Sequence, residues 1–155
     1  MLEVKNLSIA FSDSLEKKVV DDLTFSVCSG EILALVGESG SGKSLSALSI
    51  PRLLPIGANI VSGSVHLAGE DLFRLTTSEM SKIRGSKIGV IFQEAQSSLN
   101  PVLSIGNQIS EAFGDKFLRR KADSREKVVA MLKDVGIKEA ETMLDRYPHE
   151  FSGGQ

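Results

Sequence analysis

Apolar and polar positions alternate along the first part of the chain, as they do in strands that have one wet face. Residues 2–11 and 19–27 both show this alternation, and the polar segment 12–18 between them predicts a hairpin loop. Residues 32–36, Ile-Leu-Ala-Leu-Val, form an unbroken apolar run. Such a run fits a strand buried on both faces of a parallel sheet. A second apolar run, residues 88–92, predicts another strand.

A short strand and a helix are predicted between these two apolar runs. Residues 63–69 have the pattern of a short edge strand, on which His66 faces outward. Thr76 is followed three residues later by Glu79, which is the pattern of a helix-opening capping box. We therefore expect a helix that continues to about Ile83.

After Gln93 the apolar spacing becomes helical. Three helices are predicted there, over residues 104–113, 123–136 and 138–145, the last of them stopped by Pro148. Their apolar positions are Ile105, Ile109 and Phe113 in the first helix and Val128, Leu132 and Val135 in the second. The sequence thus predicts a β-rich part followed by a helical part. These stripes are expected to serve internal packing, with a surface for a partner as the alternative.

Length and composition suit a soluble globular domain. The 155 residues, 41% of them hydrophobic and 25% charged, are enough for a real core. A net charge of −2 gives no general attraction to nucleic acid, so no nucleic-acid partner is expected. No apolar run approaches the ~20 residues that span a bilayer. Strand-like sequence starts at Leu2, so we expect no signal peptide and a cytosolic chain.

Residues 37–44 read Gly-Glu-Ser-Gly-Ser-Gly-Lys-Ser and match the phosphate-binding loop pattern G-x-x-x-x-G-K-S/T. Glycines let the backbone N–H groups wrap around a phosphate, and the following helix, which Pro51 should end or kink, presents its positive dipole end. Lys43 supplies a mobile charge for the β- and γ-phosphates, and Ser44 a hydroxyl for Mg²⁺. The expected nucleotide contacts are Gly37, Glu38, Ser39, Gly40, Ser41, Gly42, Lys43, Ser44 and Leu45.

The last five residues, Phe151-Ser152-Gly153-Gly154-Gln155, resemble the signature sequence LSGGQ of ATP-binding-cassette (ABC) ATPases, with Phe151 in place of leucine. They follow a phosphate loop, a strand ending in Gln93 and a helical stretch, so the resemblance covers the whole chain. It implies an α/β fold: a P-loop NTPase of ABC type, with an N-terminal antiparallel β portion, a partial RecA-like core and a helical subdomain. The implied domains are an ATP-binding core over residues 1–95 and the helical subdomain over residues 96–155.

One branch of the family is especially similar. Residues 91–101, Ile-Phe-Gln-Glu-Ala-Gln-Ser-Ser-Leu-Asn-Pro, resemble the Q-loop region of importer subunits for oligopeptides, dipeptides, nickel and glutathione, usually FQEPMTSLNP. Residues 146–154 look like the same branch. Ala95 replaces the usual proline, and Gln155 stands where many members have methionine. The resemblance implies the ATP-binding, energy-coupling subunit of an importer for peptides or a related small solute such as nickel or glutathione.

The resemblance also implies residue roles, with ATP and Mg²⁺ as cofactors. Gln93 would act with Lys43 in catalysis, touching Mg²⁺ or its water, and Phe11 aligns with the aromatic residue that stacks on adenine. Ser152, Gly153, Gly154 and Gln155 would contact ATP held by a second subunit in a head-to-tail dimer. A serine hydroxyl, glycine N–H groups and a helix start together form an anion site. Permease helices would dock near residues 93–101, at the inner face of the cell membrane.

The family's later elements have no counterpart in this sequence. These are an apolar strand ending in Asp-Glu and a switch histidine, and the resemblance places them beyond residue 155. Phosphoryl transfer depends on stabilising developing charge. We therefore expect these 155 residues to bind nucleotide better than they hydrolyse it. The alternatives are a non-hydrolysing nucleotide-binding module and a soluble, non-transport ABC ATPase. The implied dimer pairs either two copies or two related chains, and Phe11 can stack on either purine.

Overall fold

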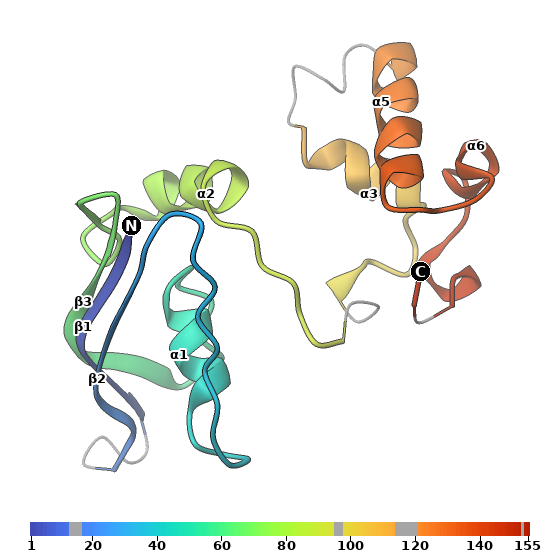
Figure 1. Ribbon diagram of the computed structural model, residues 1–155. Coiled ribbons are helices and arrows are strands. Elements are labelled where there is room, and N and C mark those ends of the chain that lie inside the picture. The colour runs from blue at the N-terminus through green and yellow to red at the C-terminus, as the bar shows by residue number, and fades with distance from the viewer. Residues whose placement is uncertain (13–16, 95–97, 114–120, 153) are drawn as a thin grey trace. The chain divides into compact units, whose positions relative to one another are not determined.

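The computed structural model describes residues 1–12, 17–94, 98–113, 121–152 and 154–155, with backbone alone for residues 121–124. The chain divides into two compact units, Met1–Gly89 and Val90–Gln155 (Figure 1). The functional boundary expected at residue 95 stays a prediction.

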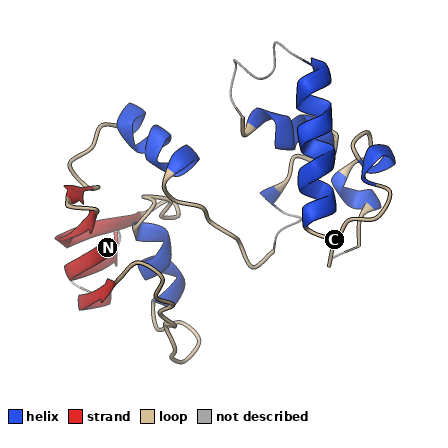
Figure 2. Cartoon of the chain, turned by 45° about the horizontal axis from the view of Figure 1, so that its top comes forward, coloured by secondary structure: helices blue, strands red, loops and turns tan. Residues whose placement is uncertain are grey.

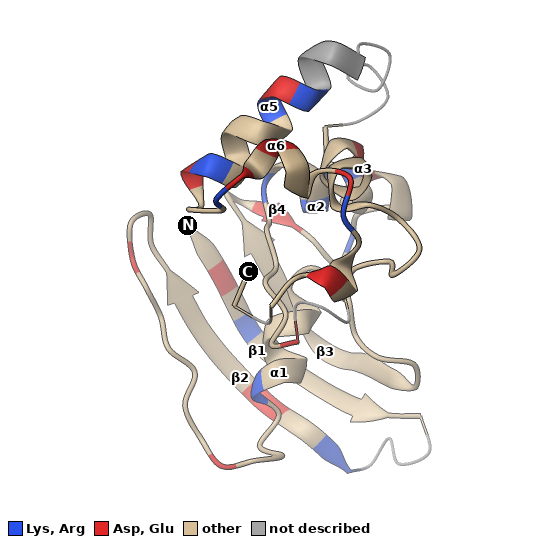
Figure 3. Ribbon diagram, turned by 90° about the vertical axis from the view of Figure 1, so that its right-hand side faces the viewer, with Lys and Arg blue, Asp and Glu red and all other residues tan. Residues whose placement is uncertain are grey.

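An antiparallel sheet forms the centre of the first unit. Strand β1 (Leu2–Phe11) pairs with β2 (Lys18–Val27) on one side and with β3 (Ala58–Leu67) on the other. The two-residue β4 (Glu70–Asp71) pairs with β3, so the strand order is β2-β1-β3-β4. The strands are drawn in red in Figure 2. The alternation in residues 2–11 and 19–27 therefore predicted the first two strands correctly. Both strands carry charges of both signs, without a basic stripe (Figure 3).

Strand β3 is longer and more central than the predicted edge strand at residues 63–69. Gly63 lies inside it with φ +97°, and a Cβ added there would be 2.5 Å from the carbonyl oxygen of Asn6. The β1–β3 register shifts nearby, which marks a bulge at which the two backbones approach closely. His66 is half-buried rather than exposed. Its Nδ1 is buried without a hydrogen-bond partner among the described residues.

The core of the first unit is built from the sheet and helix α2 (Thr77–Ser86), and Leu45 packs against it from the chain after the glycine-rich segment. Met80 and Ile83 of α2 pack in one cluster with β1 residues such as Leu7 and Ile9. The predicted capping box is present, because the Glu79 N–H donates to Thr76 Oγ1 (3.3 Å) and the Thr76 N–H donates to Glu79 Oε2 (2.8 Å). Helix α1 (Lys43–Ser49) ends before Pro51, also as predicted.

The prediction of strands at residues 32–36 and 88–92 is wrong, because the described chain forms no strand there. Ile32 is 96% exposed, Val36 88% and Ile91 97%. A strand exists only where a neighbouring strand accepts and donates its ladder of hydrogen bonds. No described segment pairs with either run, so the local apolar pattern could not determine the outcome.

The second unit is helical, as predicted. It contains α3 (Ile105–Glu111), α5 (Lys121–Asp134), α6 (Ala140–Met143) and the 3₁₀ turn η2 (Pro148–Glu150) (Figure 1). Within the described residues, no helix combines the length and the apolarity that crossing a membrane requires.

The predicted apolar stripes hold only as far as their helices continue. Val128 and Leu132 of α5 are buried against Ala140 and Leu144. Val135, however, is 74% exposed, because α5 ends one residue before it and the helical spacing no longer determines its direction. Gly136 has φ +82° beyond this end, which agrees with the predicted helix stop. Phe113 likewise lies beyond the end of α3 and is 36% exposed.

Candidate functional site

The glycine-rich segment 37–44 leads directly into α1. Its backbone turns at Gly40 (φ +82°) and Gly42 (φ +85°), in the left-handed region that glycine favours. Gly42 is buried against β2: a Cβ added there would lie 2.7 Å from Val20 Cγ2 and 2.9 Å from the Val19 carbonyl oxygen. Gly40 faces open space. The loop can therefore approach β2 this closely only with glycine at position 42.

A cavity of about 300 Å³ opens over this loop. It is lined by Val19, Gly40, Ser41, Gly42, Lys43, Ser44 and Leu45. The backbone N–H groups of Lys43, Ser44 and Leu45 belong to the first turn of α1, which has no carbonyl of its own to offer them. Within the described chain they donate to no other group. Free N–H groups beside a cation form a site for an anion such as phosphate.

The Lys43 ammonium group lies across the loop. Its Nζ donates to the carbonyl oxygens of Gly37 (2.9 Å) and Glu38 (2.6 Å) and to Ser41 Oγ (3.3 Å). Among the described residues it has no carboxylate partner. An arriving anion therefore meets a cation held by neutral oxygens, and no ion pair has to break.

Two residues that support this loop were missed by the sequence analysis. Val19 of β2 forms a wall of the cavity. Ser46 is buried, and both its N–H (2.8 Å) and its hydroxyl (3.0 Å) donate to the Gly42 carbonyl oxygen, which secures the junction of loop and helix. No local signal could identify Val19, because its role depends on where β2 lies in the folded sheet.

Two other expected nucleotide contacts, Phe11 and Gln93, are not among the residues that line this cavity. Phe11 is half-buried at the end of β1, opposite Ala58, and does not line the cavity. Gln93 is exposed and follows an irregular segment instead of a strand. It belongs to the second unit and Ser44 to the first, so the two expected Mg²⁺ contacts lie in different units. Their roles stay predictions. The described residues contain no cluster of histidine, cysteine and carboxylate groups that could hold a metal.

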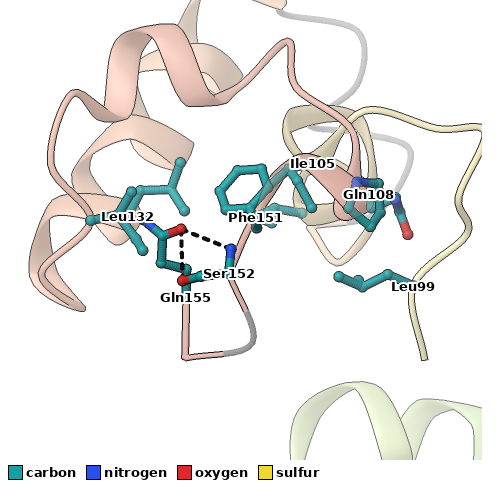
Figure 4. A pocket seen from close by; sticks show the side chains of 10 residues that line it. Leu99, Ile105, Gln108, Leu132, Phe151, Ser152 and Gln155 are labelled. Carbon is teal, nitrogen blue, oxygen red and sulfur yellow. Dashed lines mark hydrogen bonds between the residues drawn. The ribbon is translucent and has the colours of Figure 1, made fainter. Parts of the chain in front are cut away.

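The signature-like segment forms a tight turn after η2. The N–H and the hydroxyl of Ser152 both donate to Gln155 Oε1, at 3.0 and 3.1 Å (Figure 4). The Gln155 N–H also donates to the Ser152 carbonyl oxygen (2.9 Å). Gly154 is exposed, and Gly153 lies outside the described residues.

An apolar pocket of about 280 Å³ adjoins this turn, and the sequence analysis did not anticipate it (Figure 4). It is lined by Leu99, Ile105, Gln108, Ile109, Leu132, Ile137, Pro148, Phe151, Ser152 and Gln155. Gln108 ties the loop at one side of it to α3, because its Nε2 donates to the carbonyl oxygens of Asn100 (3.0 Å) and Leu103 (2.9 Å). This loop belongs to the region in which permease contacts are expected.

Comparison with known proteins agrees with the expected family. The model of a family described as "ABC transporter" matches residues 20–155. A putative peptide import ATP-binding protein of Brucella abortus is 44% identical over 156 aligned residues, which cover 100% of this chain and 47% of the relative. The oligopeptide transport ATP-binding protein AppD of Bacillus subtilis is also 44% identical, with 99% of this chain and 48% of the relative covered.

Among solved structures, the ATP-binding cassette MJ0796 in a dimeric post-hydrolysis state bound to ADP and Pi has a TM-score of 0.81 to this chain. The sequence identity is 26%, and the match covers 100% of this chain and 65% of the other. The α/β fold of ABC type is thereby confirmed. The chain spans about half the length of the curated relatives it matches.

Proposed function

This chain belongs to the ABC transporter family, and from that premise we propose that it binds ATP as part of the energy-coupling subunit of an importer for peptides. The observation that carries the proposal is the cavity over residues 40–45. Within the described chain it brings together N–H groups that donate to no other group and the Lys43 ammonium, which has no carboxylate partner there. Relatives named for peptide and oligopeptide import support the class of solute. Nickel and glutathione are the variants that the related importer branch suggests.

The loop fits a polyphosphate chemically. A Cβ at Gly42 would collide with β2, so the cradle requires glycine there. Lys43 would exchange the neutral carbonyl oxygens of Gly37 and Glu38 for charged phosphate oxygens, and charge-assisted hydrogen bonds are about twice as strong as neutral ones. The Ser44 hydroxyl, which is on an exposed residue, would hold Mg²⁺, with Gln93 as the second contact. Mg²⁺, when bound, neutralises charge on the β- and γ-phosphates.

The proposed site is completed by a second subunit. Ser152 and its neighbours Gly153, Gly154 and Gln155 would contact the γ-phosphate of ATP held on the loop of that subunit. The dimeric state of the MJ0796 cassette supports this arrangement. Permease subunits would contact the surface near Gln93 and Pro101, at the inner face of the membrane. ATP hydrolysis in the whole protein would then reset the dimer and drive import.

Substitution of Lys43 tests the proposal. We expect Lys43→Ala in the natural protein to weaken Mg²⁺-ATP binding by about 10- to 100-fold, because a charged hydrogen-bond donor contributes about 1.5–3 kcal/mol. Calorimetric titration measures the change. The matched control is Lys87→Ala, which removes a half-exposed lysine paired with Glu70 and should leave the Kd unchanged. Unchanged binding in Lys43→Ala would refute the proposed site.

The transport part needs its own assay. The subunit reconstituted with its permease in vesicles should take up a labelled short peptide only when ATP is present on the subunit's side. Lys43→Ala should abolish this uptake. Uptake that is independent of ATP, or an absence of peptide uptake while nickel or glutathione is transported, would overturn the peptide assignment and leave ATP binding intact.

A further inference from the structure

Two arginines join the far end of α1 to the rest of the first unit. Arg84 of α2 donates from Nε to the Pro51 carbonyl oxygen (2.7 Å) and from Nη2 to the Arg52 carbonyl oxygen (3.0 Å). Arg52 donates from Nη1 to the carbonyl oxygens of Leu75 (2.6 Å) and Leu72 (3.4 Å). These four bonds, called the arginine clasp here, connect the exit of α1, the segment that follows β4, and α2.

The clasp is made entirely with neutral backbone acceptors. Neither Arg52 nor Arg84 has a carboxylate partner among the described residues, although both side chains belong to half-buried residues. The carbonyl groups at the end of a helix carry partial negative charge, and arginine there is favourable. The planar guanidinium of Arg84 spans two successive carbonyls, which a lysine ammonium cannot do in the same geometry.

The backbone conformation at Arg52 is unfavourable for a residue with a Cβ, which indicates that the arginine side chain contributes an interaction that glycine could not make. Its φ is +55°, in the left-handed region that costs about 1–2 kcal/mol for a residue with a Cβ. This is the place after a helix at which glycine is usual. The chain carries an arginine there and bonds its guanidinium to two carbonyls. Glycine at position 52 would relieve the backbone and delete the two clasp bonds that the Arg52 side chain donates.

Besides the clasp, helix α1 is held by Leu45, and directly after it by Ile50, which are partly buried and pack against the core of the first unit. The fully buried residues of α1 are Ser46 and Ser49, and residues 32–36, immediately before the phosphate loop, are largely exposed. The helix has seven residues and is therefore about 10 Å long. A tilt of about 6° at its far end would move the loop end by about 1 Å. The N–H groups that line the cavity are at that end.

We propose that Arg52 and Arg84 are positioning residues, which fix the direction of α1 and so hold the phosphate loop in its binding geometry. The inference rests on the proposed ATP site and deepens it. Neither residue lines the loop cavity, so both act through α1. Displacement of binding groups by 1 Å can cost up to about 100-fold in function, and partial release of one helix end should cost about tenfold.

The test compares Mg²⁺-ATP binding and stability in Arg84→Gln, Arg84→Lys, Arg52→Gly and Arg74→Gln variants of the natural protein. Arg74→Gln is the control: that side chain is 88% exposed, and the ion pair it forms within the described part of the chain is with Asp71 (3.2 Å). We expect the Kd to rise about tenfold in Arg84→Gln and Arg52→Gly, to rise less in Arg84→Lys, and to stay unchanged in the control. The nucleotide-free amide NMR signals of Gly40 and Gly42 should shift in the first two variants only.

Measuring the melting temperature together with the Kd distinguishes a positioning role from a general loss of structure. Arg52→Gly removes backbone strain, so its melting temperature should stay close to that of the natural protein while its Kd rises. Arg52→Gly therefore still tests the positioning role if Arg84→Gln fails to fold. If Arg84→Gln and Arg52→Gly bind Mg²⁺-ATP with the Kd of the natural protein while Lys43→Ala binds it more weakly, the positioning role of the two arginines is refuted. The proposed ATP site then still stands. Failure of the natural protein to bind ATP would instead refute the proposed function.

Discussion

At the scale of single residues, Gly40 and Gly42 show two different reasons for glycine in a phosphate loop. One is a positive φ, and the other is a close approach to a neighbouring strand. Both have positive φ, yet a Cβ would meet open space at Gly40 and β2 at Gly42. We expect Gly42→Ala to lower the free energy of unfolding by about 1–3 kcal/mol, because overpacking adds to the cost of the backbone conformation. Gly40→Ala carries the backbone cost alone, about 1 kcal/mol.

Chemical denaturation of both variants, with Mg²⁺-ATP titration, measures these effects. Nucleotide binding should be weakened most in Gly42→Ala, whose loop has to move away from Val19 and Val20. Equal destabilisation by the two substitutions would contradict the close approach of the loop to β2.

The sequence predicted these glycines, Lys43 and Ser44 as a group, because the backbone and the charge that bind phosphate are consecutive in the chain. Val19 and Arg84 could not be found in this way. They reach the loop and the exit of α1 from β2 and α2, and only the fold brings them there. Local motifs reveal the groups that touch a ligand more readily than the groups that hold those groups in place.

At the scale of elements, two exposed ion pairs join α5 to α6 and the residues that follow it. Arg125 Nη2 lies 3.1 Å from Asp145 Oδ2, and Lys133 Nζ lies 2.5 Å from Glu141 Oε1. Hydrogen bonding from Arg125 lowers the pKa of the Asp145 carboxyl below its usual 3.8, and hydrogen bonding from Lys133 lowers the pKa of Glu141 below its usual 4.5. Both carboxylates are therefore stabilising when ionised.

The sign of the pH dependence follows from these lowered pKa values. The stabilisation is complete above the usual pKa values and is lost as the pH falls through the lower values of the folded state. We expect the protection of the amides of residues 125–145 against hydrogen exchange, corrected for the pH dependence of intrinsic exchange, to fall on acidification below about pH 4.5 and in high salt, because both pairs are exposed to screening. In Glu141→Gln/Asp145→Asn this acid response should be weaker. An identical response in that variant would exclude the ion pairs as its cause.

The elements that were predicted correctly are those whose cause is local. Alternation defined β1 and β2, and the capping box defined the start of α2. The prediction failed for residues 32–36 and 88–92, whose apolar side chains favour a strand but whose ladder needs a partner from elsewhere in the chain. It also shortened β3, because Gly63 suggests a loop when the close approach of β1 is unknown. Long-range pairing is the information that the sequence pattern lacked.

At the scale of the whole molecule, the proposed head-to-tail dimer makes a prediction about which chain supplies each half of a site. Each site would take Lys43 from one chain and Ser152 from the other. Chains with Lys43→Ala or Ser152→Asp alone should form inactive homodimers, the second because a carboxylate repels the γ-phosphate. A heterodimer of the two variants would contain one intact site and one site with both defects.

Heterodimers of the natural protein, purified through two different affinity tags, allow a direct comparison. The Lys43→Ala chain paired with the Ser152→Asp chain should hydrolyse ATP, because one composite site keeps both groups. The matched heterodimer pairs an unchanged chain with a doubly substituted chain, so it carries the same two substitutions, yet each of its sites has one defect. It should be inactive. If instead the matched heterodimer is active and the first heterodimer is not, Lys43 and Ser152 of the same chain form a site. The two heterodimers carry the same substitutions, so they differ only in whether Ser152 acts on the loop of its own chain or on that of the other chain.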